Sequence, residues 1–455
     1  MALTTGVGPG AAAADWRTAT APGGLPLLGH LVPLRRRPLE FLTSLPHEGD
    51  VVELRMGRRT VHMVCHPDLV AQVLKDPRTF DRGGPFYEKT KLLMGNSLGN
   101  CPYADHRRQR LLVQPSFRRE RIGTYPRVMR EEMAAETANW RPGGTIEAND
   151  RMHAVTARIG ARVLLSTDIG VGHVDRILRG LPIVLKGMYK RMVAPVGLVY
   201  RLPAPEQRRF DAALADLREL IDSIIRDYRG SAEDHGDLLS GLLAARDEDG
   251  LGLSDQEIHD QVMNFLTAST ETTATALAWA LQLLGRNPDC ERRLQEEADA
   301  WAASGGVDAH GRDGLDYTRQ VVTEVLRLYP PGWLVTRVVT ADTELGGVRL
   351  PVGAVVFYSS YALHRNGELF PDPERFDPDR WSPERVGEVP RGAMIPFGAG
   401  SRKCIGDDYA MVETTLALAT IASKWRLRPT SDTPVHPKPR ALVGMGDLPM
   451  VTLPR

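Results

Sequence analysis

Apolar residues recur at steps of three and four along long stretches of the chain, which is the period of an amphipathic helix. Between residues 210 and 228 these steps alternate without a break. The apolar face of this predicted helix consists of Phe210, Leu214, Leu217, Ile221, Ile224 and Tyr228. The pattern therefore predicts one long helix that packs along a single side.

Two further helices carry their own start and stop signals. Ser254 and Glu257 form a capping box, so a helix is predicted from there to about Leu284. Another is expected over residues 317–329, where Pro330 and the proline after it stop it. Helices should therefore make up most of the fold.

Alternation of polar and apolar residues is confined to short segments. Residues 51–56 and 60–64 alternate around the turn Gly57-Arg58-Arg59 and predict a β-hairpin. Similar short strands are expected late in the chain, at residues 347–350, 354–358 and 450–453. The predicted elements together give a fold class that is mainly α with a small β portion. The chain shows no internal repeats.

Composition narrows the class of protein without deciding its function. Lysine plus arginine equals aspartate plus glutamate at 57 each among 455 residues, so net charge gives no reason to expect a nucleic-acid partner. Residues 1–24 are rich in Ala, Gly and Thr and lack the pattern of a signal peptide or membrane anchor, so they are expected to be a disordered tail before a folded domain at 25–455. The few, widely spaced cysteines favour a reducing cytoplasm: Cys65, Cys101, Cys290 and Cys404.

One of these cysteines has unusual neighbours. Cys404 follows a glycine-rich turn that contains Gly398, and an apolar helix is expected after it. Helix N-termini stabilise thiolates. Glycines permit turns that other residues cannot adopt, and Gly406 would let a flat ligand approach closely. Arg402 can pair with a carboxylate on that ligand.

The segment Phe397-Gly398-Ala399-Gly400-Ser401-Arg402-Lys403-Cys404-Ile405-Gly406 resembles the haem-binding loop of the cytochrome P450 family, F-x-x-G-x-R-x-C-x-G, at every defined position. The resemblance extends from about residue 26 to the C-terminus. It implies a single-domain, triangular fold and haem b as the cofactor. It also implies that Cys404 is the thiolate ligand of the iron and that Phe397, Gly398, Arg402 and Gly406 surround it.

A second resemblance concerns structure rather than catalysis. Glu324-Val325-Leu326-Arg327 is similar to the family's E-x-x-R motif, and residues 376–381 are similar to the segment that supplies its third member, Arg380. Alone, such a pair three residues apart on a helix would be an ordinary exposed ion pair. The resemblance implies a buried network of Glu324, Arg327 and Arg380.

The helix that begins at Ser254 carries a third motif. Ala268-Ser269-Thr270-Glu271-Thr272 resembles the family's oxygen-activation sequence, which implies that Ala268 lies over the haem and that Glu271 and Thr272 relay protons. The alternative is a threonine that bonds its own helix beside a solvated glutamate. Ser269 departs from the usual glycine or alanine, which puts the shape of the oxygen groove in question.

Basic residues complete the resemblance. His106 and Arg110 match the C-helix positions that bind haem propionates, and Arg337 resembles a further propionate partner. Electrons would come from separate proteins, a ferredoxin and its reductase, because the chain has no flavin or dinucleotide fingerprint. The basic face proposed for the ferredoxin consists of Arg107, Arg108, Arg118, Arg119 and Lys403.

The expected substrate is a hydrophobic small molecule, oxidised with O2. Residues 187–192, 200–203 and 80–86 resemble actinobacterial members that act on sesquiterpenes, which indicates secondary metabolism such as antibiotic biosynthesis. A macrolide, steroid or fatty acid stays open as the substrate. The predicted pocket residues are mostly apolar: Phe86, Tyr87, Leu93, Met94, Phe265, Leu266, Ala268, Trp333, Leu334, Val335 and Val443.

Other classes explain less of the sequence. A cysteine hydrolase would need a histidine signature for Cys404, which the chain lacks. A haem-binding sensor, or a thiolate-haem protein that is not an oxygenase, would have no use for the Glu271-Thr272 pair. The acidic turn Asp247-Glu248-Asp249 is interpreted as a solvated loop rather than a metal site. We expect a monomer without a membrane anchor.

Overall fold

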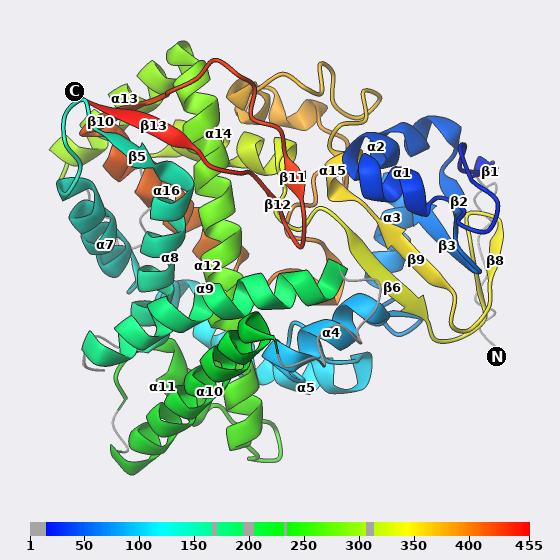
Figure 1. The fold of residues 1–455 in the computed structure, drawn as a ribbon, viewed down its shortest axis with the longest axis horizontal. Coiled ribbons are helices and arrows are strands. Elements are labelled where there is room, and N and C mark those ends of the chain that lie inside the picture. Colours follow the sequence, from blue (N-terminus) through cyan, green and yellow to red (C-terminus); the bar gives the residue numbers. More distant parts are fainter. Residues whose placement is uncertain (1–14, 166–170, 194–203, 232–233, 306–313) are drawn as a thin grey trace, which may run out of the picture.

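The computed structural model describes residues 15–165, 171–193, 204–231, 234–305 and 314–455. Helices fill one side of the molecule and the largest sheet lies at the other, near the N-terminus (Figure 1). None of the helices in these ranges combines the length and the apolar character needed to cross a membrane. The helices are α1 (Leu31–Arg36), α2 (Pro38–Glu48), α3 (Pro67–Lys75), α4 (Pro85–Met94), α5 (Tyr103–Val113), α6 (Arg119–Ile122), α7 (Pro126–Ala138), α8 (Ala148–Leu164), α9 (Val171–Val193), α10 (Pro205–Ser231), α11 (Leu238–Ala244), α12 (Asp255–Arg286), α13 (Pro288–Ala303), α14 (Asp316–Leu328), α15 (Ser360–Leu363) and α16 (Asp407–Ala422).

Within the described ranges the strands form four sheets. The largest has the order β1-β2-β3-β9-β6-β4, a second has β10-β13-β5, and β11-β12 and β7-β8 are two-stranded. The predicted hairpin is confirmed as β2 paired with β3, with Val51 opposite Val64. The strands are β1 (Thr18–Thr20), β2 (Val51–Met56), β3 (Arg59–Val64), β4 (Phe80–Asp81), β5 (Thr145–Glu147), β6 (Val335–Val339), β7 (Thr343–Leu345), β8 (Val348–Leu350), β9 (Val355–Tyr358), β10 (Trp425–Pro429), β11 (Lys438–Pro439), β12 (Val443–Gly444) and β13 (Pro449–Pro454).

The N-terminal boundary differs from the prediction. Residues 1–14 lie outside the described residues, but Thr18–Thr20 forms β1 and pairs in parallel with β2. Arg17 is held by Asp50, whose carboxylate accepts from the Arg17 backbone N–H at 2.9 Å. Ala21 is buried. The part of the predicted tail from residue 15 onward is therefore ordered, because it completes a sheet edge, and a three-residue strand is too short to show a period in the sequence.

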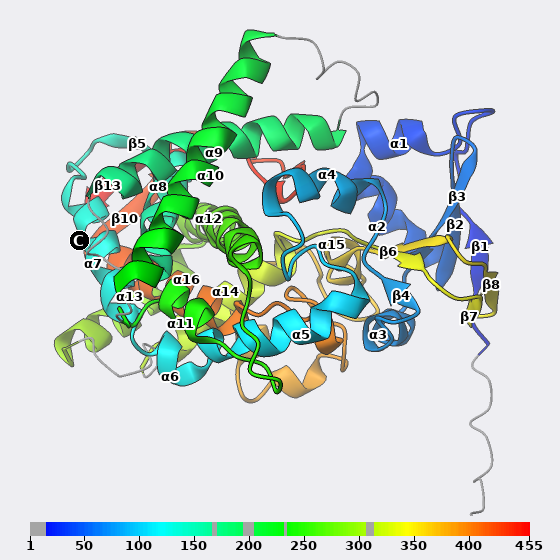
Figure 2. The same cartoon turned by 90° about the horizontal axis from the view of Figure 1, so that it is seen from below.

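Helix α12 runs through the centre of the helical side. Its capping box is present as predicted, with the Ser254 Oγ accepting from the Glu257 N–H at 3.2 Å. Seen almost end-on, α12 is surrounded by other helices (Figure 2). Most of its length is buried, which explains why its apolar pattern is less one-sided than that of α10.

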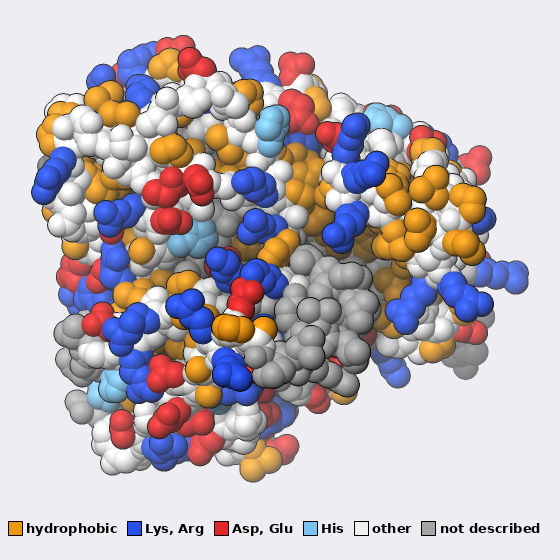
Figure 3. Space-filling model, viewed as in Figure 1, with side chains coloured by type: hydrophobic (Ala, Val, Ile, Leu, Met, Phe, Trp, Pro, Cys, Tyr) orange, Lys and Arg blue, Asp and Glu red, His pale blue; other side chains and the backbone are white. Residues whose placement is uncertain are grey.

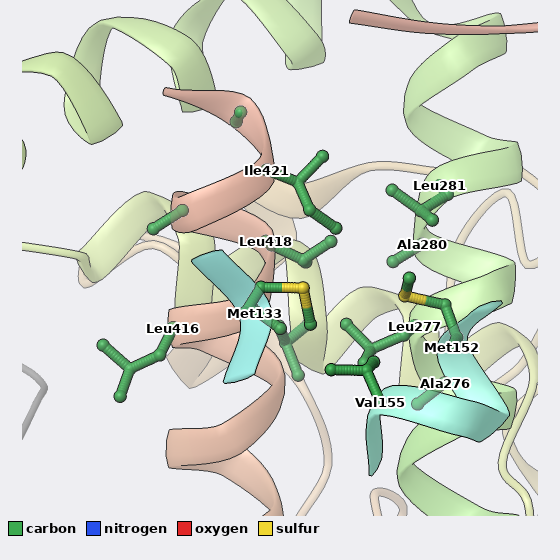
Figure 4. Packing of buried hydrophobic residues seen from close by; sticks show 14 of the residues in the cluster. Met133, Met152, Val155, Ala276, Leu277, Ala280, Leu281, Leu416, Leu418 and Ile421 are labelled. Atoms are coloured by element: carbon green, nitrogen blue, oxygen red, sulfur yellow. The ribbon is translucent and has the colours of Figure 1, made fainter. Parts of the chain in front are cut away.

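The core between α7, α8, α12 and α16 fixes the position of α12. Met133 of α7 and Met152 of α8 fill the space between the aliphatic side chains of α12 and α16 (Figure 4). These residues are almost completely buried. Since close-packed interiors deform little, this core holds α12 and α16 at a set separation.

A buried ionic network joins α14 to the segment before the Cys404 loop. The Glu324 carboxylate accepts from Arg327 Nη2 at 2.8 Å and lies 3.7 Å from the Nε of Arg380. It also accepts from the indole N–H of Trp381 at 2.8 Å. Glu324 and Arg327 have no exposed surface. Glu324, Arg327 and Arg380 thus lie together, as the resemblance implied. We propose that their network stabilises the fold and takes no part in catalysis.

Candidate active site

The Cys404 loop is a tight turn between a 3₁₀ helix (Gly400–Arg402) and α16. Gly398 and Gly400 have φ angles of 68° and 70°, in the left-handed region. At Gly400 a side chain is also excluded sterically, because a Cβ atom would lie 2.2 Å from the Leu74 carbonyl oxygen. The Cys404 N–H donates to the Phe397 carbonyl at 2.9 Å and closes the turn. The glycines are therefore required by the backbone itself.

This turn presents the Cys404 side chain to a cavity of about 380 Å³ between α12 and the loop. Cys404 is exposed to this cavity, and the protein packed around the loop raises the pKa of its thiol by desolvation. The Gly406 N–H, at the start of α16, bonds the sulfur and opposes that rise. The start of the helix thus lowers the pKa of Cys404, as predicted, but the rise caused by desolvation is larger.

All nine residues that the sequence assigned to cofactor binding line this one cavity. They come from four separate parts of the chain: α5, α12, β6 and the Cys404 loop. They are His106, Arg110, Ala268, Arg337, Phe397, Gly398, Arg402, Cys404 and Gly406. Their roles at the cofactor remain proposals, but their convergence on one space fits a single ligand.

The cavity carries a surplus of positive charge, to which Arg82 contributes as well. Arg402 donates to Asp81 at 2.7 Å. Within the described residues, Arg82, Arg110 and Arg337 hydrogen-bond only to carbonyl, amide and hydroxyl oxygens. The Nε atoms of Arg82 and Arg402 are buried without a hydrogen-bond partner. Buried charge of this kind requires compensation by anions.

The same arginines act on His106. Burial and then the nearby charges of Arg402, Arg82 and Arg110 lower the pKa of His106 to about 3. His106 is therefore a neutral hydrogen-bonding group rather than a further cation. A ligand with two carboxylates and a metal for the Cys404 sulfur would satisfy this donor set, and haem with its two propionates is such a ligand. The open space over Gly406, where a Cβ atom would meet only Phe117 at 3.9 Å, agrees with a flat ligand.

Arg82 lines the cavity beside these arginines, and the sequence interpretation did not assign it to the site. In the sequence analysis its segment, residues 80–86, was used to predict the substrate class and not the cofactor site. The strand pair β4–β6 places Asp81 opposite Val338 and so brings Arg82 beside Arg337 and Arg402. An arginine after a short strand is common in proteins, so the sequence alone does not indicate that Arg82 lies at this cavity.

The proton-relay pair on α12 is only partly brought to the cavity. Thr272 lines it, and its hydroxyl donates to the Ala268 carbonyl at 2.7 Å. Glu271 is not among the lining residues, and its carboxylate lies 4.0 Å from Nε2 of His153 on α8. Adjacent helical residues point about 100° apart, and Glu271 falls on the side of α12 that faces α8. As the alternative interpretation held, the threonine bonds its own helix in this state.

Ser269 lines the cavity as well, and its hydroxyl donates to the Phe265 carbonyl at 2.8 Å. It packs against Gly160 of α8, where a Cβ atom would lie 2.7 Å from the Ser269 Oγ. The helix is unbroken at this point, from Asp255 to Arg286. The departure at Ser269 is thus accommodated by a glycine on the neighbouring helix.

The predicted substrate residues divide into two groups. Tyr87, Phe265, Ala268 and Val335 line the cavity, whereas the side chain of Phe86 lies outside the described residues. The other six do not line this cavity and stay predictions as substrate contacts: Leu93, Met94, Leu266, Trp333, Leu334 and Val443. Trp333, for example, donates its indole N–H to the Arg440 carbonyl at 2.9 Å. Apolar lining residues that the sequence did not single out include Leu98, Phe117, Val163, Leu164, Ala276 and Leu326.

A buried acid that the sequence interpretation missed lies next to the cavity. Glu413 on α16 is 1% exposed, and neither carboxyl oxygen has a hydrogen-bond partner in the described residues. The hydroxyls of Thr273 and Tyr409, which line the cavity, have none either. Burial raises the pKa of Glu413 to about 8, although the nearby Thr273 opposes this. Its carboxyl is therefore largely protonated at neutral pH.

This pKa predicts a pH dependence of stability. Between its ordinary value of 4.5 and about 8, the unfolded chain releases the Glu413 proton while the folded protein keeps it. The free energy of unfolding should therefore fall as pH rises through this window, by up to about 5 kcal/mol. Glu413→Gln should lose most of this fall, as measured by urea unfolding at about pH 5 and about pH 8. The control is Glu248→Gln at an exposed position, and equal pH profiles for wild type and Glu413→Gln would contradict the prediction.

Comparison with known proteins agrees with this site. The cytochrome P450 family model matches residues 20–452. The chain is 50% identical over 441 residues to cyclooctat-9-en-7-ol 5-monooxygenase and 51% identical over 442 residues to cyclooctatin synthase, both from Streptomyces melanosporofaciens, with 97% of this chain and 96% of each relative covered.

Two further comparisons agree with the family and with the fold. The chain is 43% identical to pentalenene oxygenase of Streptomyces avermitilis over 93% of this chain and 94% of the relative. The crystal structure of the cytochrome P450DA haem domain superposes with a TM-score of 0.83 at 25% identity, covering 97% of this chain and 98% of that one. The family model and the relatives agree with the Cys404 loop and with the residues that converge on the cavity. The chain therefore belongs to the cytochrome P450 family and is a haem-thiolate monooxygenase.

Proposed function

We propose that this monooxygenase hydroxylates a terpene in secondary metabolism. The observation that carries the proposal is the near full-length likeness to three Streptomyces enzymes, two of which are named as oxygenases. Two of them concern cyclooctatin, a diterpene, and the third pentalenene, a sesquiterpene. The sequence interpretation favoured a sesquiterpene, and the higher identity of the first two adds a diterpene as an equal candidate.

The cavity supports a substrate with few polar groups. Phe265 of α12 packs against Phe117, with the ring planes tilted by 58° and the centroids 5.1 Å apart, and both line the cavity together with Val335 of β6. Such walls bind hydrocarbon through burial and shape, while few groups can pair with a polar substituent. A carboxylate substrate would also compete with the cofactor for the arginines.

We propose the following roles for the residues. Bound haem would supply the chemistry that activates dioxygen, at an iron held by the Cys404 sulfur. Arg82, Arg110, Arg337 and Arg402 would hold its carboxylates, and neutral His106 would donate a hydrogen bond to one of them. In the observed rotamer, the Thr272 oxygen can accept a hydrogen bond from a water in the cavity, since its own proton goes to Ala268. Glu271, on the His153 side of α12, could exchange protons with solvent and pass them on only after a change of rotamer.

We also propose a ferredoxin and its reductase as the electron source. Of the basic residues expected to bind the ferredoxin, Arg107 and Arg118 are exposed. The side chain of Arg119 lies outside the described residues. Arg108 is already engaged, with Asp247 at 3.3 Å and Glu257 at 2.7 Å, and Lys403 pairs with Asp407. The expected basic face is therefore smaller than predicted.

An optical titration of the purified ferric protein tests the substrate class. Candidates are a cyclic diterpene, a cyclic sesquiterpene, a fatty acid and a macrolide aglycone. We expect a low-to-high-spin shift of the haem band with a terpene and none with the fatty acid or the macrolide. Val335→Phe should weaken the terpene response about tenfold or more by filling the cavity. A shift only with another class would overturn the terpene proposal and leave the monooxygenase assignment intact.

A further inference from the structure

Four leucines near the N-terminus are exposed side by side. Leu25, Leu27, Leu28 and Leu31 are 47%, 94%, 49% and 39% exposed, and we call them the Leu27 patch. Hydrophobic side chains gather over α1 and the chain leading into it, with basic side chains beside them (Figure 3). Single exposed leucines are ordinary, but a contiguous group on one loop usually marks an interaction site.

The loop that carries the patch is held rigidly. The Leu28 carbonyl accepts from the Gly57 N–H at 3.2 Å, and Gly29 bridges to Met56, so the loop lies on the turn between β2 and β3. Buried His30 anchors its far end, with Nε2 2.9 Å from the Ala21 carbonyl oxygen. Leu27 itself has a φ of 62°, which is uncommon for a residue other than glycine. The backbone thus holds Leu27 outward at the tip of a convex loop.

Arginines surround the patch. Arg35 and Arg36 lie in the last turn of α1, and Arg58 and Arg59 lie at the β2–β3 turn; all four reach the surface. No carboxylate of the described residues lies within 4 Å of them. The neighbouring acids Glu40 and Glu53 instead pair with Arg37 at 3.7 Å and with Arg55 at 3.9 Å. The patch is therefore apolar at its tip and positively charged at its rim.

We propose that the Leu27 patch docks the protein reversibly on an anionic lipid surface. The leucines would enter the headgroup boundary, and the four arginines would lie against lipid phosphates. A convex tip suits a lipid surface, which deforms around it, whereas a protein partner would need a matching hollow. Self-association through this patch would bring like charges together, which disfavours a second copy. The proposal does not depend on the identity of the substrate.

Vesicle flotation of the haem-loaded protein tests this. One set of vesicles is phosphatidylcholine alone, and the other contains phosphatidylglycerol as well. We expect binding to the anionic vesicles only, weakened by salt. The double variant Arg58→Gln/Arg59→Gln should bind about thirtyfold more weakly, and Leu27→Ser/Leu28→Ser at least about tenfold more weakly.

Matched controls separate the patch from general surface effects. Arg208→Gln/Arg209→Gln removes two exposed charges on α10, and Leu251→Ser removes a leucine that is 62% exposed elsewhere. Both should bind vesicles like wild type, and haem spectra should be unchanged in every variant. The proposal is overturned if wild type does not bind anionic vesicles at low salt, or if both patch variants bind as well as the controls. It is also overturned if sedimentation shows that the leucines instead hold two copies together.

Discussion

Replacing Cys404 by serine should abolish oxygenation while leaving a folded protein. The side chain stands on a turn whose shape depends on Gly398, Gly400 and the Cys404 backbone N–H rather than on the sulfur. A hydroxyl in place of the thiol keeps the volume nearly unchanged but removes the thiolate that donates electron density to the iron. Product formation should fall below detection, and the absorption band of the reduced, CO-bound protein should move away from its thiolate-ligated position.

Cys290→Ser is the matched control, since Cys290 is half-buried and packs against the core around α12 without lining the cavity. It should keep both the spectrum and the activity. If Cys404→Ser retained the thiolate spectrum, another residue would have to be the ligand. The far-ultraviolet circular dichroism of both variants shows whether the loss is one of chemistry or of folding.

Replacing Glu324 by alanine should cause a large loss of stability. Its carboxylate accepts from Arg327 and from the Trp381 indole, and lies near Arg380, in a place without exposed surface. Removing one partner of a buried ionic network leaves the other charges uncompensated, which costs about 3–5 kcal/mol. Urea unfolding at neutral pH measures this loss as a shift of the midpoint.

The control for this prediction is Glu296→Ala on α13. Glu296 pairs with Arg292 at 3.3 Å, but its side chain is 64% exposed, so the pair contributes less than about 1 kcal/mol. A comparably small effect for Glu324→Ala would show that solvent reaches the network. Activity is a poor measure of this loss, because a less stable protein also loses haem.

Local signals account for the part of the site that the sequence located. Eight of the nine residues assigned to cofactor binding belong to short motifs, Arg337 being the exception, and the fold brings all nine together around one cavity. The capping box at Ser254 and the Gly398–Gly400 turn also depend on residues close in sequence. Such local features can be predicted from the sequence, because they depend little on the rest of the fold.

Contacts between distant segments explain why some of the predicted pocket residues do not line the cavity. Trp333 and Leu334 are as apolar as Val335, but only Val335 lines the cavity, since successive residues on and before β6 point in different directions. Leu266 is adjacent to Phe265 and is turned into the core instead. Hydrophobicity shows that a residue is buried, whereas the side on which it is buried depends on the neighbouring elements.

The family, the candidate thiolate ligand and the main helices could be predicted from the sequence alone, since these depend on residue type and short-range spacing. The three-dimensional structure was needed to show that Arg82 joins the charged end of the cavity, that Glu271 faces His153, and that Glu413 is buried. Each of these depends on the environment that remote elements create around a side chain. The free energy of a charge is set by that environment, and a linear pattern of residues does not contain it.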